Sequence, residues 1–413
     1  MNYVIIGNSA AAIGCVEGIR SLDTAGEITV ISKEPHHTYS RPLISYYLQG
    51  KTDLEKIKYR PDDFYIKNRV RLLAGCEALK IDAVKKKVLL SNKKSVMYDK
   101  LLFAAGSSPF IPPIKGLDTL NRVFTFMSRT DAQALESAIN KSSRVLIVGA
   151  GLIGLKCAEG ILNRVAEVTV VDVADRILPN VLDMESAEMV QSFLETKGIR
   201  FVLSTAVSAF DRTCAELSNG QRIVFDEVVI AAGVRPNTSL LCALGCDARR
   251  GVATDERLAT EYPDIYAAGD CTLSHDISSG DSKVLALLPN AYMQGETAGI
   301  NMAGGSKTYD NPIPMNSTKL FGLPIVTAGS YIGESYTVTG ENQYKKLFTK
   351  NNLFKGFILV GSIERAGIYT SLITDSTPLD TIDFDLIKDK PQLMAFSTVQ
   401  RQQKLGGAKN AQN

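Results

Sequence analysis

The sequence contains the stretch Val145-Leu146-Ile147-Val148-Gly149-Ala150-Gly151-Leu152-Ile153-Gly154 and, near its start, the related stretch Val4-Ile5-Ile6-Gly7-Asn8-Ser9-Ala10-Ala11-Ala12. In each stretch a short β-branched apolar run is followed by glycine and then by residues that suit a helix. A strand, a tight turn and a helix N-terminus in this order bind a pyrophosphate on backbone N–H groups and on the positive end of the helix dipole. The repeated pattern therefore predicts two dinucleotide-binding units in one α/β chain.

The two turns differ in how many glycines they keep. The second keeps all three glycines of the Gly-x-Gly-x-x-Gly pattern, whereas the first keeps only Gly7 and has Ser9 and Ala12 at the other two positions. Both substitutes are small, so the backbone can still approach a phosphate closely. Because many strand–helix turns are glycine-rich for steric reasons alone, a purely structural turn stays an alternative, more so for the first.

Composition and charge narrow the class of protein. A length of 413 residues predicts two or three domains, and 45% apolar residues is ordinary for a soluble globular protein. The net charge of +2 argues against a nucleic-acid-binding surface, and no apolar stretch approaches the ~20 residues of a membrane span. No basic region precedes the apolar run at residues 3–6, so we expect a core strand there and not a signal peptide.

The cysteines and histidines indicate the compartment and argue against a metal site. The odd number of scattered cysteines, without a Cys-x-x-Cys pair, suits a reducing cytoplasm, and three histidines leave little material for metal binding. The cysteines are Cys15, Cys76, Cys157, Cys214, Cys242, Cys246 and Cys271. We therefore expect a cytoplasmic protein with free thiols and no metal.

An acidic residue follows the second strand of each unit. Glu34 lies 27 residues after Gly7, and Asp172 lies 23 residues after Gly149. A carboxylate at this place accepts hydrogen bonds from the two ribose hydroxyls of a dinucleotide and repels the extra phosphate of NADP, so Asp172 favours NAD. An exposed loop carboxylate stays an equal alternative for Glu34, and an ordinary strand-end aspartate a weaker one for Asp172.

Other segments outline the rest of the chain. Residues 101–106 and 226–233 each read as a buried strand followed by a glycine, and residues 264–270 read as a strand followed by Gly269-Asp270. From about residue 307 the pattern changes to four strands and a helix, which predicts a small α+β domain. The expected strands are 325–328, 336–339, 344–349 and 354–360, and the expected helix is 365–374. The tail from residue 401 is expected to be disordered.

These segments in this order resemble pyridine-nucleotide:flavin oxidoreductases of the glutathione-reductase-like superfamily, over about residues 1–400. The resemblance rests on the two glycine turns and on Ala104-Ala105-Gly106-Ser107, Ala231-Ala232-Gly233-Val234-Arg235-Pro236 and Tyr266-Ala267-Ala268-Gly269-Asp270. It implies two Rossmann-like domains, for FAD and for NAD(H), and a C-terminal α+β interface domain. The implied boundaries are 1–108 with 236–306 for FAD, 109–235 for NAD, 307–400 for the interface domain and 401–413 for the tail.

The resemblance also assigns cofactor-binding residues. Thr38-Tyr39-Ser40-Arg41-Pro42-Leu43-Ile44-Ser45-Tyr46 is similar to the Arg-Pro-x-x-Ser segment of rubredoxin reductases, ferredoxin reductases and the flavin parts of nitrite reductases. Residues implied at FAD are Gly7, Ser9, Ala12, Glu34, Arg41, Pro42, Ala105, Gly106, Gly269, Asp270, Pro289 and Asn290. Residues implied at NAD are Gly149, Gly151, Leu152, Ile153, Gly154, Asp172, Ala232 and Gly233. A surface-loop arginine is the alternative for Arg41, and a helix N-cap is compatible with the role of Asp270.

Three departures from the family pattern bear on mechanism. Tyr46 stands where many relatives have lysine, Lys156 stands where many have glutamate, and no redox cysteine lies in the segment where disulfide-reducing relatives carry one. Both substitutions fall close to the expected stack of flavin on nicotinamide. Without a thiolate near the flavin, a thiol–disulfide relay has no nucleophile, so electrons must leave the flavin directly.

The resemblance thus implies an FAD oxidoreductase that moves electrons between NAD(H) and a one-electron protein of the rubredoxin or ferredoxin type. It extends to the FAD-NAD oxidoreductase partner of carbon monoxide dehydrogenase, whose redox partner is a ferredoxin-like subunit. An NADH oxidase or peroxidase is an alternative, and an NADH-sensing flavoprotein with an interaction role is another. A homodimer or a heteromeric complex is compatible with the sequence, and we expect no nucleic-acid or membrane partner.

Overall fold

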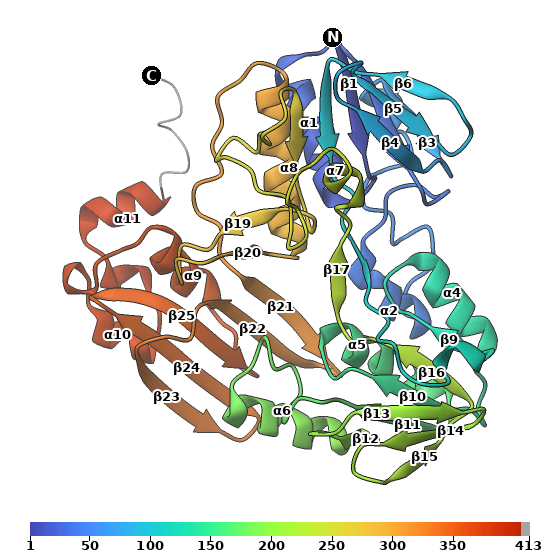
Figure 1. Ribbon diagram of the computed structural model, residues 1–413. Helices are drawn as coiled ribbons and strands as arrows, with labels where there is room; N and C mark the ends of the chain where they lie inside the picture. Colours follow the sequence, from blue (N-terminus) through green and yellow to red (C-terminus); the bar gives the residue numbers. More distant parts are fainter. Residues whose placement is uncertain (406–413) are drawn as a thin grey trace. The chain divides into compact units, whose positions relative to one another are not determined.

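A computed structural model of the chain describes residues 1–405, and the chain divides into two compact units (Figure 1). The first unit comprises Met1–Asn180, Gln191–Ser274 and Ser282–Asp310. The second comprises Val181–Val190, His275–Asp281 and the chain from Asn311 onward. Among residues 1–405, no helix combines the length and apolar character needed to cross a bilayer.

The first half of the first unit is built on a sheet of five parallel strands in the order β18-β7-β1-β2-β3. These are β1 (Asn2–Ile6), β2 (Glu27–Ser32), β3 (Val70–Ala74), β7 (Lys100–Phe103) and β18 (Ile265–Ala267). Side chains alternate between the two faces, so Tyr3 and Ile5 pack on helices whereas Val4 and Ile6 pack on a small antiparallel sheet. The helices are α1 (Ala10–Leu22) and α8 (Leu288–Met302), and the small sheet is β4 (Ala78–Asp82), β5 (Lys87–Leu90) and β6 (Ser95–Met97).

The second half of this unit repeats the arrangement. Its parallel sheet has the order β12-β11-β10-β16-β9, with α5 (Leu152–Ile161) following β10 directly. The strands are β9 (Val123–Phe124), β10 (Arg144–Val148), β11 (Glu167–Val171), β12 (Ile199–Val202) and β16 (Glu227–Ile230). A second small antiparallel sheet consists of β13 (Val207–Asp211), β14 (Cys214–Leu217) and β15 (Arg222–Val224). Both predicted strand–helix–strand units are therefore confirmed.

Two short strands join the halves. Strand β8 (Ser107–Pro109) leaves the first sheet, β17 (Val234–Pro236) leaves the second, and the two pair antiparallel. The remaining elements of the unit are α2 (Ile44–Leu48), α3 (Phe64–Lys67), α4 (Arg129–Ala138) and α7 (Ser239–Cys242). Helix α6 (Met184–Glu195) and strand β19 (Leu273–His275) have residues in both units, and β20 (Ser282–Val284) belongs to the first.

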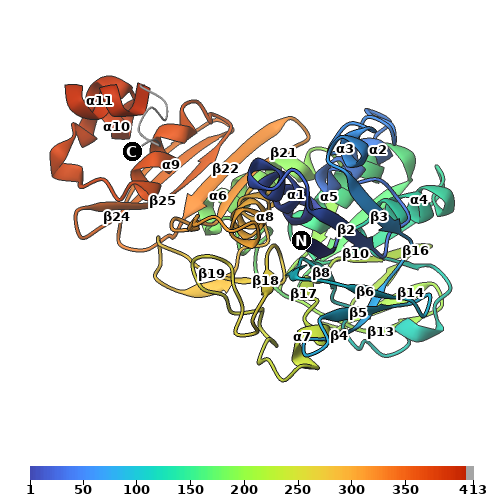
Figure 2. The same cartoon turned by 90° about the horizontal axis from the view of Figure 1, so that it is seen from above.

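Helices α1 and α8 lie side by side and touch backbone to backbone (Figure 2). A Cβ atom on Gly14 or Gly18 of α1 would lie 2.3 or 2.4 Å from a carbonyl oxygen of α8. A Cβ atom on Gly295 or Gly299 of α8 would lie 1.9 or 2.3 Å from a carbonyl oxygen of α1. These four glycines therefore set the distance between the helices, and α1 begins at the first glycine turn.

The second unit contains an antiparallel sheet in the order β21-β22-β25-β24-β23, with α9 (Ala366–Thr374) packed on it. The strands are β21 (Met315–Leu320), β22 (Leu323–Gly329), β23 (Glu334–Gly340), β24 (Gln343–Lys350) and β25 (Leu353–Val360). The four expected strands and the helix are confirmed. The sequence pattern missed β21, α10 (Phe384–Asp389) and α11 (Thr398–Leu405), which are polar or short.

The expectation of a disordered tail from residue 401 is wrong for its first part, because α11 runs to Leu405. Residues 406–413 lie outside the described residues. The predicted boundaries between the FAD, NAD and interface domains stay predictions.

Replacing Gly295 with alanine tests the contact between the helices. The new Cβ would meet a backbone oxygen, which cannot swing away, so we expect the free energy of unfolding to fall by about 3 kcal/mol. The control is Gly367→Ala in α9, where a Cβ meets no atom within 4 Å and alanine is expected to stabilise by about 0.5–1 kcal/mol. Thermal and urea unfolding measure both, and a Gly295→Ala protein as stable as the wild type would contradict the account.

Candidate functional site

The first glycine of each turn is fixed by a carbonyl of the neighbouring strand's end. Gly7 has φ +116°, and a Cβ atom on it would lie 2.0 Å from the carbonyl oxygen of Ala104. Gly149 has φ +122°, and its Cβ would lie 2.2 Å from the carbonyl oxygen of Ala231. Only glycine fits both the positive φ and this approach. The turns and the Ala-Ala-Gly segments therefore belong to one structural unit in each half.

The backbone geometry at the second glycine position explains why the first turn can have Ser9 there. Ser9 has φ −113° and Gly151 has φ −75°, both ordinary values for any residue. A Cβ on Gly151 would meet no protein atom within 4 Å, so glycine leaves open space there. Neither α1 nor α5 has a side-chain cap at its N-terminus. The free N–H groups of these helix ends fit a pyrophosphate.

The third glycine position holds glycine in the second turn and alanine in the first. A Cβ on Gly154 would lie 2.0 Å from the carbonyl oxygen of Gly149, so glycine is required there. Ala12, its counterpart in the first turn, is fully buried. Leu152 and Ile153 form the first turn of α5.

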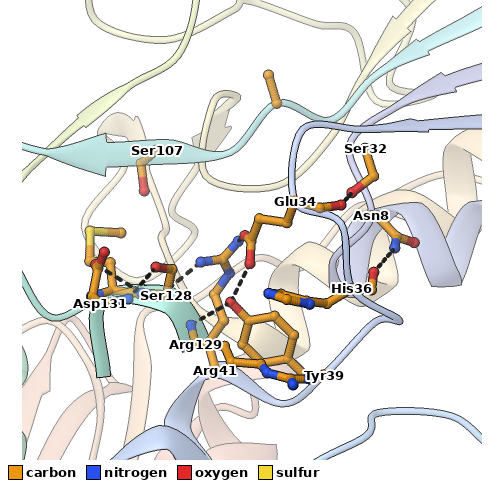
Figure 3. Close-up of polar contacts among 12 residues, drawn as sticks. Asn8, Ser32, Glu34, His36, Tyr39, Arg41, Ser107, Ser128, Arg129 and Asp131 are labelled. Carbon is orange, nitrogen blue, oxygen red and sulfur yellow. Dashed lines mark hydrogen bonds and ion pairs between the residues drawn. The ribbon is translucent and has the colours of Figure 1, made fainter. Parts of the chain in front are cut away.

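Glu34 lies just beyond β2 and is held by two side chains of the following loop (Figure 3). Nη2 of Arg41 donates to Oε1 of Glu34 at 2.5 Å, and the hydroxyl of Tyr39 donates to Oε2 at 2.6 Å. Burial, followed by the carboxylate beside it, raises the pKa of Tyr39 above its ordinary value, so the phenol stays protonated. Glu34 is therefore built into a polar cluster, which excludes the free loop carboxylate that the sequence left open.

The segment before α4 joins this cluster. The Arg129 N–H donates to the Tyr39 hydroxyl at 2.9 Å, and Nη1 of Arg41 donates to the Met127 carbonyl at 2.8 Å. Ser128 and Asp131 fix this segment as a reciprocal capping box at the start of α4 (Figure 3). Sequence reasoning missed Tyr39 and Arg129, although the Ser-x-x-Asp spacing signals the helix start.

Three buried polar atoms around this cluster have no hydrogen-bond partner among the described residues. They are Nε of Arg129, Nε2 of His37 and Oγ1 of Thr38. A buried polar group without a partner costs about 1–3 kcal/mol, so such groups mark a place where a polar ligand completes the structure. The phosphate and hydroxyl groups of FAD supply the acceptors and donors that these atoms lack, so the residues fit this cofactor.

Asp270 follows β18, and Gly269 before it packs against Ala11 of α1. Oγ of Ser107 donates to Oδ2 of the aspartate at 3.2 Å, and the preceding Gly269 N–H donates to Oε1 of Gln294 in α8 at 2.6 Å. Burial raises the pKa of Asp270 above its ordinary value. No helix begins at Asp270, so the helix N-cap that the sequence allowed is wrong. Gln294, which the sequence did not single out, positions this segment.

The two crossings meet through Asn237. Its side-chain amide donates to the carbonyl of Ala105 at 2.9 Å, and its backbone N–H donates to the carbonyl of Gly106 at 2.9 Å. The carbonyl of Gly233 accepts from the Phe110 N–H, and Ala232 precedes that glycine. Sequence reasoning identified both crossings but not that they pair. Pro42 and Pro289 each lie in the first turn of a helix, with Asn290 buried behind Pro289.

Asp172 follows β11 and lies beside the second turn. Its Oδ2 accepts from the Ala150 N–H at 2.6 Å, and its Oδ1 accepts from the Ala174 N–H at 2.8 Å. The side chain therefore holds the turn, a role that its spacing did not indicate. Each carboxylate oxygen accepts more than one hydrogen bond, so acceptor capacity toward a ribose remains. Its part in binding NAD stays a prediction.

Tyr46 and Lys156, the two departures from the family pattern, contact one another. Nζ of Lys156 lies 4.8 Å from the centre of the Tyr46 ring, which gives a cation–π contact between α5 and α2. The same ammonium pairs with Glu159, one turn further along α5, and both side chains are nearly buried. Sequence reasoning missed Glu159. The contact joins the two dinucleotide-binding halves, and the effect of these residues on mechanism stays a prediction.

The cysteines nearest to these elements in sequence are buried thiols. Cys271 follows Asp270 directly, and burial raises its pKa to about 11. Cys15 in α1 and Cys157 in α5 are fully buried, and burial raises their pKa values as well. A neutral buried thiol is a poor nucleophile, so these three cysteines are not poised for disulfide exchange.

Asp270→Asn tests the cost of the buried carboxylate in the protein without cofactor. When folding raises the pKa of a carboxyl group, that group destabilises the folded protein as the pH rises. For Asp270 the loss of stability begins near the ordinary pKa of 3.8 and is complete above the raised pKa. We therefore expect the variant to unfold at a higher urea concentration than the wild type at pH 7, with the difference shrinking toward pH 4. The control Asp264→Asn removes a carboxylate whose pKa two lysines lower, so that variant must lose stability at pH 7. An Asp270→Asn difference that grows toward pH 4 would contradict the account.

Comparison with known proteins identifies the family. The model of the pyridine nucleotide-disulphide oxidoreductase family matches residues 1–295. The chain is 32% identical to the NADH-dependent phenylglyoxylate dehydrogenase subunit epsilon of Aromatoleum evansii, over 91% of this chain and 93% of that protein. It is 34% identical to an NADH oxidase of Methanocaldococcus jannaschii, over 74% of this chain and 70% of that protein. The assimilatory nitrate reductase electron transfer subunit of Bacillus subtilis is 31% identical over 87% of this chain, which spans about half (47%) of that protein.

Solved structures share the fold. The covalent putidaredoxin reductase–putidaredoxin complex contains a chain that superposes with a TM-score of 0.86 at 22% identity, over 99% of both chains. An NAD-dependent persulfide reductase from A. fulgidus superposes with a TM-score of 0.85 at 27% identity, over 92% of this chain and 78% of that one. The predicted α/β fold class, the oxidoreductase activity and the cofactors FAD and NAD(H) are confirmed. The chain belongs to the pyridine nucleotide-disulphide oxidoreductase family.

Proposed function

We propose that this protein moves electrons between NAD(H) and a small iron–sulfur protein of the ferredoxin or rubredoxin type, by way of FAD. The observation that carries the proposal is the state of the cysteines beside the glycine turns and Asp270. Cys15, Cys157 and Cys271 are buried thiols with raised pKa values, so they do not supply the thiolate that a disulfide relay needs. Electrons that enter as a hydride then have to leave from the flavin itself.

The first half of the large unit has the residues to hold FAD. The turn at Gly7 and the open N-terminus of α1 suit the pyrophosphate, Glu34 suits the adenosine ribose, and Asp270 suits the ribityl chain. Arg41 and Arg129 bring positive charge to the same place. Bound there, FAD would supply a group that can accept a hydride and release electrons one at a time. The chain's own contribution is to fix the two dinucleotides and to exclude competing thiol chemistry.

The second half has the residues to hold NAD(H). The turn from Gly149 to Gly154 suits the pyrophosphate, and Asp172 suits the adenosine ribose. A carboxylate at this place disfavours the additional phosphate of NADP, so we propose NADH as the preferred nucleotide.

The identity of the acceptor rests on relatives. One is named as an electron transfer subunit, one as a probable ferredoxin reductase, and one neighbour is a putidaredoxin reductase solved in covalent complex with putidaredoxin. Whether the acceptor is a rubredoxin, a ferredoxin or a subunit of a carbon monoxide dehydrogenase system stays a prediction, as do the oligomeric state and the cytoplasmic location. An NADH oxidase is the second candidate function, since one relative at 34% identity bears that name.

The variant Arg41→Ala tests the place of FAD. Loss of the guanidinium removes one of the two side-chain donors to Glu34 and the donor to the Met127 carbonyl at the proposed site, so we expect the purified protein to retain less than about a tenth of its FAD. The control Arg60→Ala removes a comparable half-buried pair with Glu17, outside the proposed site, and should keep its FAD. Absorbance of the released flavin gives both values. Equal loss in the two variants would show that only stability had changed.

Rapid anaerobic mixing with NADH tests the electron path. We expect bleaching of the flavin absorbance near about 450 nm, and re-oxidation when a ferredoxin or rubredoxin is added. The variant Cys271→Ala should behave like the wild type, because that thiol takes no part. A flavin that stays oxidised, or a Cys271→Ala protein that no longer delivers electrons, would overturn the proposal. Fast turnover in air without an added protein would favour the oxidase.

A further inference from the structure

Strand β23 (Glu334–Gly340) is the outermost strand of the antiparallel sheet in the second unit (Figure 1). All seven of its residues are exposed, so the strand adds no side chain to the core of this unit. Its pairing with β24 is regular over all seven residues, without a bulge. Within residues 1–405, its backbone forms no backbone hydrogen bond to any element other than β24. One complete edge of a regular strand is therefore open.

The open edge lacks the features that usually prevent pairing with another chain. Natural sheets protect an edge with lysine, proline, a bulge or a short strand. Strand β23 contains no lysine, arginine or proline, and its residues 336–339 all favour extended backbone. The opposite edge strand, β21, contains Lys319 and follows Pro314. Pairing of β23 with β21 of another copy, which would build an open fibre, is therefore disfavoured.

The sequence of β23 is complementary to itself when a second copy pairs antiparallel about a two-fold axis at Thr337. Each residue then faces the residue of the copy that lies equally far beyond Thr337. On one face of the sheet, Tyr336 lies opposite Val338 of the copy, at two equivalent places. On the other face, Thr337 lies opposite its own copy and Ser335 lies opposite Thr339. Aromatic side chains opposite β-branched ones, and hydroxyls opposite hydroxyls, are cross-strand pairs that stabilise sheets.

The same register keeps like charges apart. Glu334 lies opposite Gly340 of the copy, which has no side chain. Beside Gly340 in its own chain lies Gln343 of β24, whose amide can donate to the incoming carboxylate. A two-fold axis at either neighbouring residue would lose both this match and the pair of tyrosine with valine. The strand therefore matches a copy of itself best in one register.

We propose that this protein forms a two-fold dimer in which β23 of each copy pairs antiparallel with β23 of the other, centred on Thr337. The pairing joins the five-stranded sheets of the two copies into one continuous sheet and covers both open edges. The dimer is inferred from the second unit alone, so it does not depend on the proposed electron transfer. A strand of a different protein is the alternative occupant, but it gives no reason for β23 to match itself.

A charge placed on the two-fold axis tests the dimer. Thr337→Lys brings two ammonium groups face to face in the dimer, whereas in a single copy it changes one exposed side chain. The control Ser317→Lys places the same charge at an exposed position of β21. Sedimentation equilibrium of the FAD-loaded proteins, from about 1 to 100 µM, measures dimerisation. We expect wild type and control to dimerise alike and Thr337→Lys to raise the dissociation constant at least about tenfold, with the FAD content and circular dichroism unchanged.

Cross-linking tests the register. In the variant Thr337→Cys the two new thiols meet across the axis, within the range of a disulfide, so mild oxidation should give a covalent dimer. In the matched control Ser335→Cys the new thiol lies about 13 Å along the strand from its copy, so cross-linking should stay at the wild-type background. Equal cross-linking of the two variants would overturn the proposal, as would wild-type dimerisation by Thr337→Lys. A wild type that stays monomeric at about 100 µM would also overturn it and would leave the edge to a strand of a different protein.

Discussion

The backbone contact between α1 and α8 is the constraint on which the first dinucleotide site depends. Four glycines lie at this contact: Gly14 and Gly18 on α1, and Gly295 and Gly299 on α8. They let the two helix axes approach to a distance at which a Cβ atom on any of them would overlap the backbone of the other helix. Helix α1 starts at the first glycine turn, and α8 carries Gln294, which holds Gly269 and therefore Asp270. The position of the buried carboxylate relative to the open N-terminus of α1 thus depends on the glycine contact between the helices and on the hydrogen bond from Gly269 to the Gln294 side chain.

A second constraint links each glycine turn to the crossing segment that connects the two halves of the first unit. The carbonyl oxygens of Ala104 and Ala231 occupy the space where a Cβ of Gly7 or Gly149 would lie. Just beyond these carbonyls, β8 and β17 pair, and Asn237 donates hydrogen bonds to the carbonyls of Ala105 and Gly106 in the first crossing. Because each turn is locked to its crossing and the crossings are locked to each other, the two dinucleotide sites are held as one assembly. Hydride transfer between two bound cofactors requires such fixed geometry.

The fold and the turns could be predicted because their signals are local. A β-branched run followed by glycine indicates a strand and a turn within ten residues, and spacing alone predicted Asp172 at the end of the second strand, although its part in binding NAD stays a prediction. The cluster of Glu34, Tyr39 and Arg129 could not be found this way, because it joins segments 90 residues apart through hydrogen bonds that leave no periodic trace. Strand β21, with its polar sequence, is recruited by pairing with β22.

The central claim is that electrons reach and leave this protein through FAD alone, with no sulfur relay. A stoichiometric anaerobic titration of the FAD-loaded protein with dithionite tests it most directly, because a redox-active disulfide takes up electrons that a flavin alone cannot. The account predicts that the flavin is fully reduced after about two electrons per chain and that the count of free thiols does not change. Uptake of about four electrons, with two new thiols appearing, would contradict it.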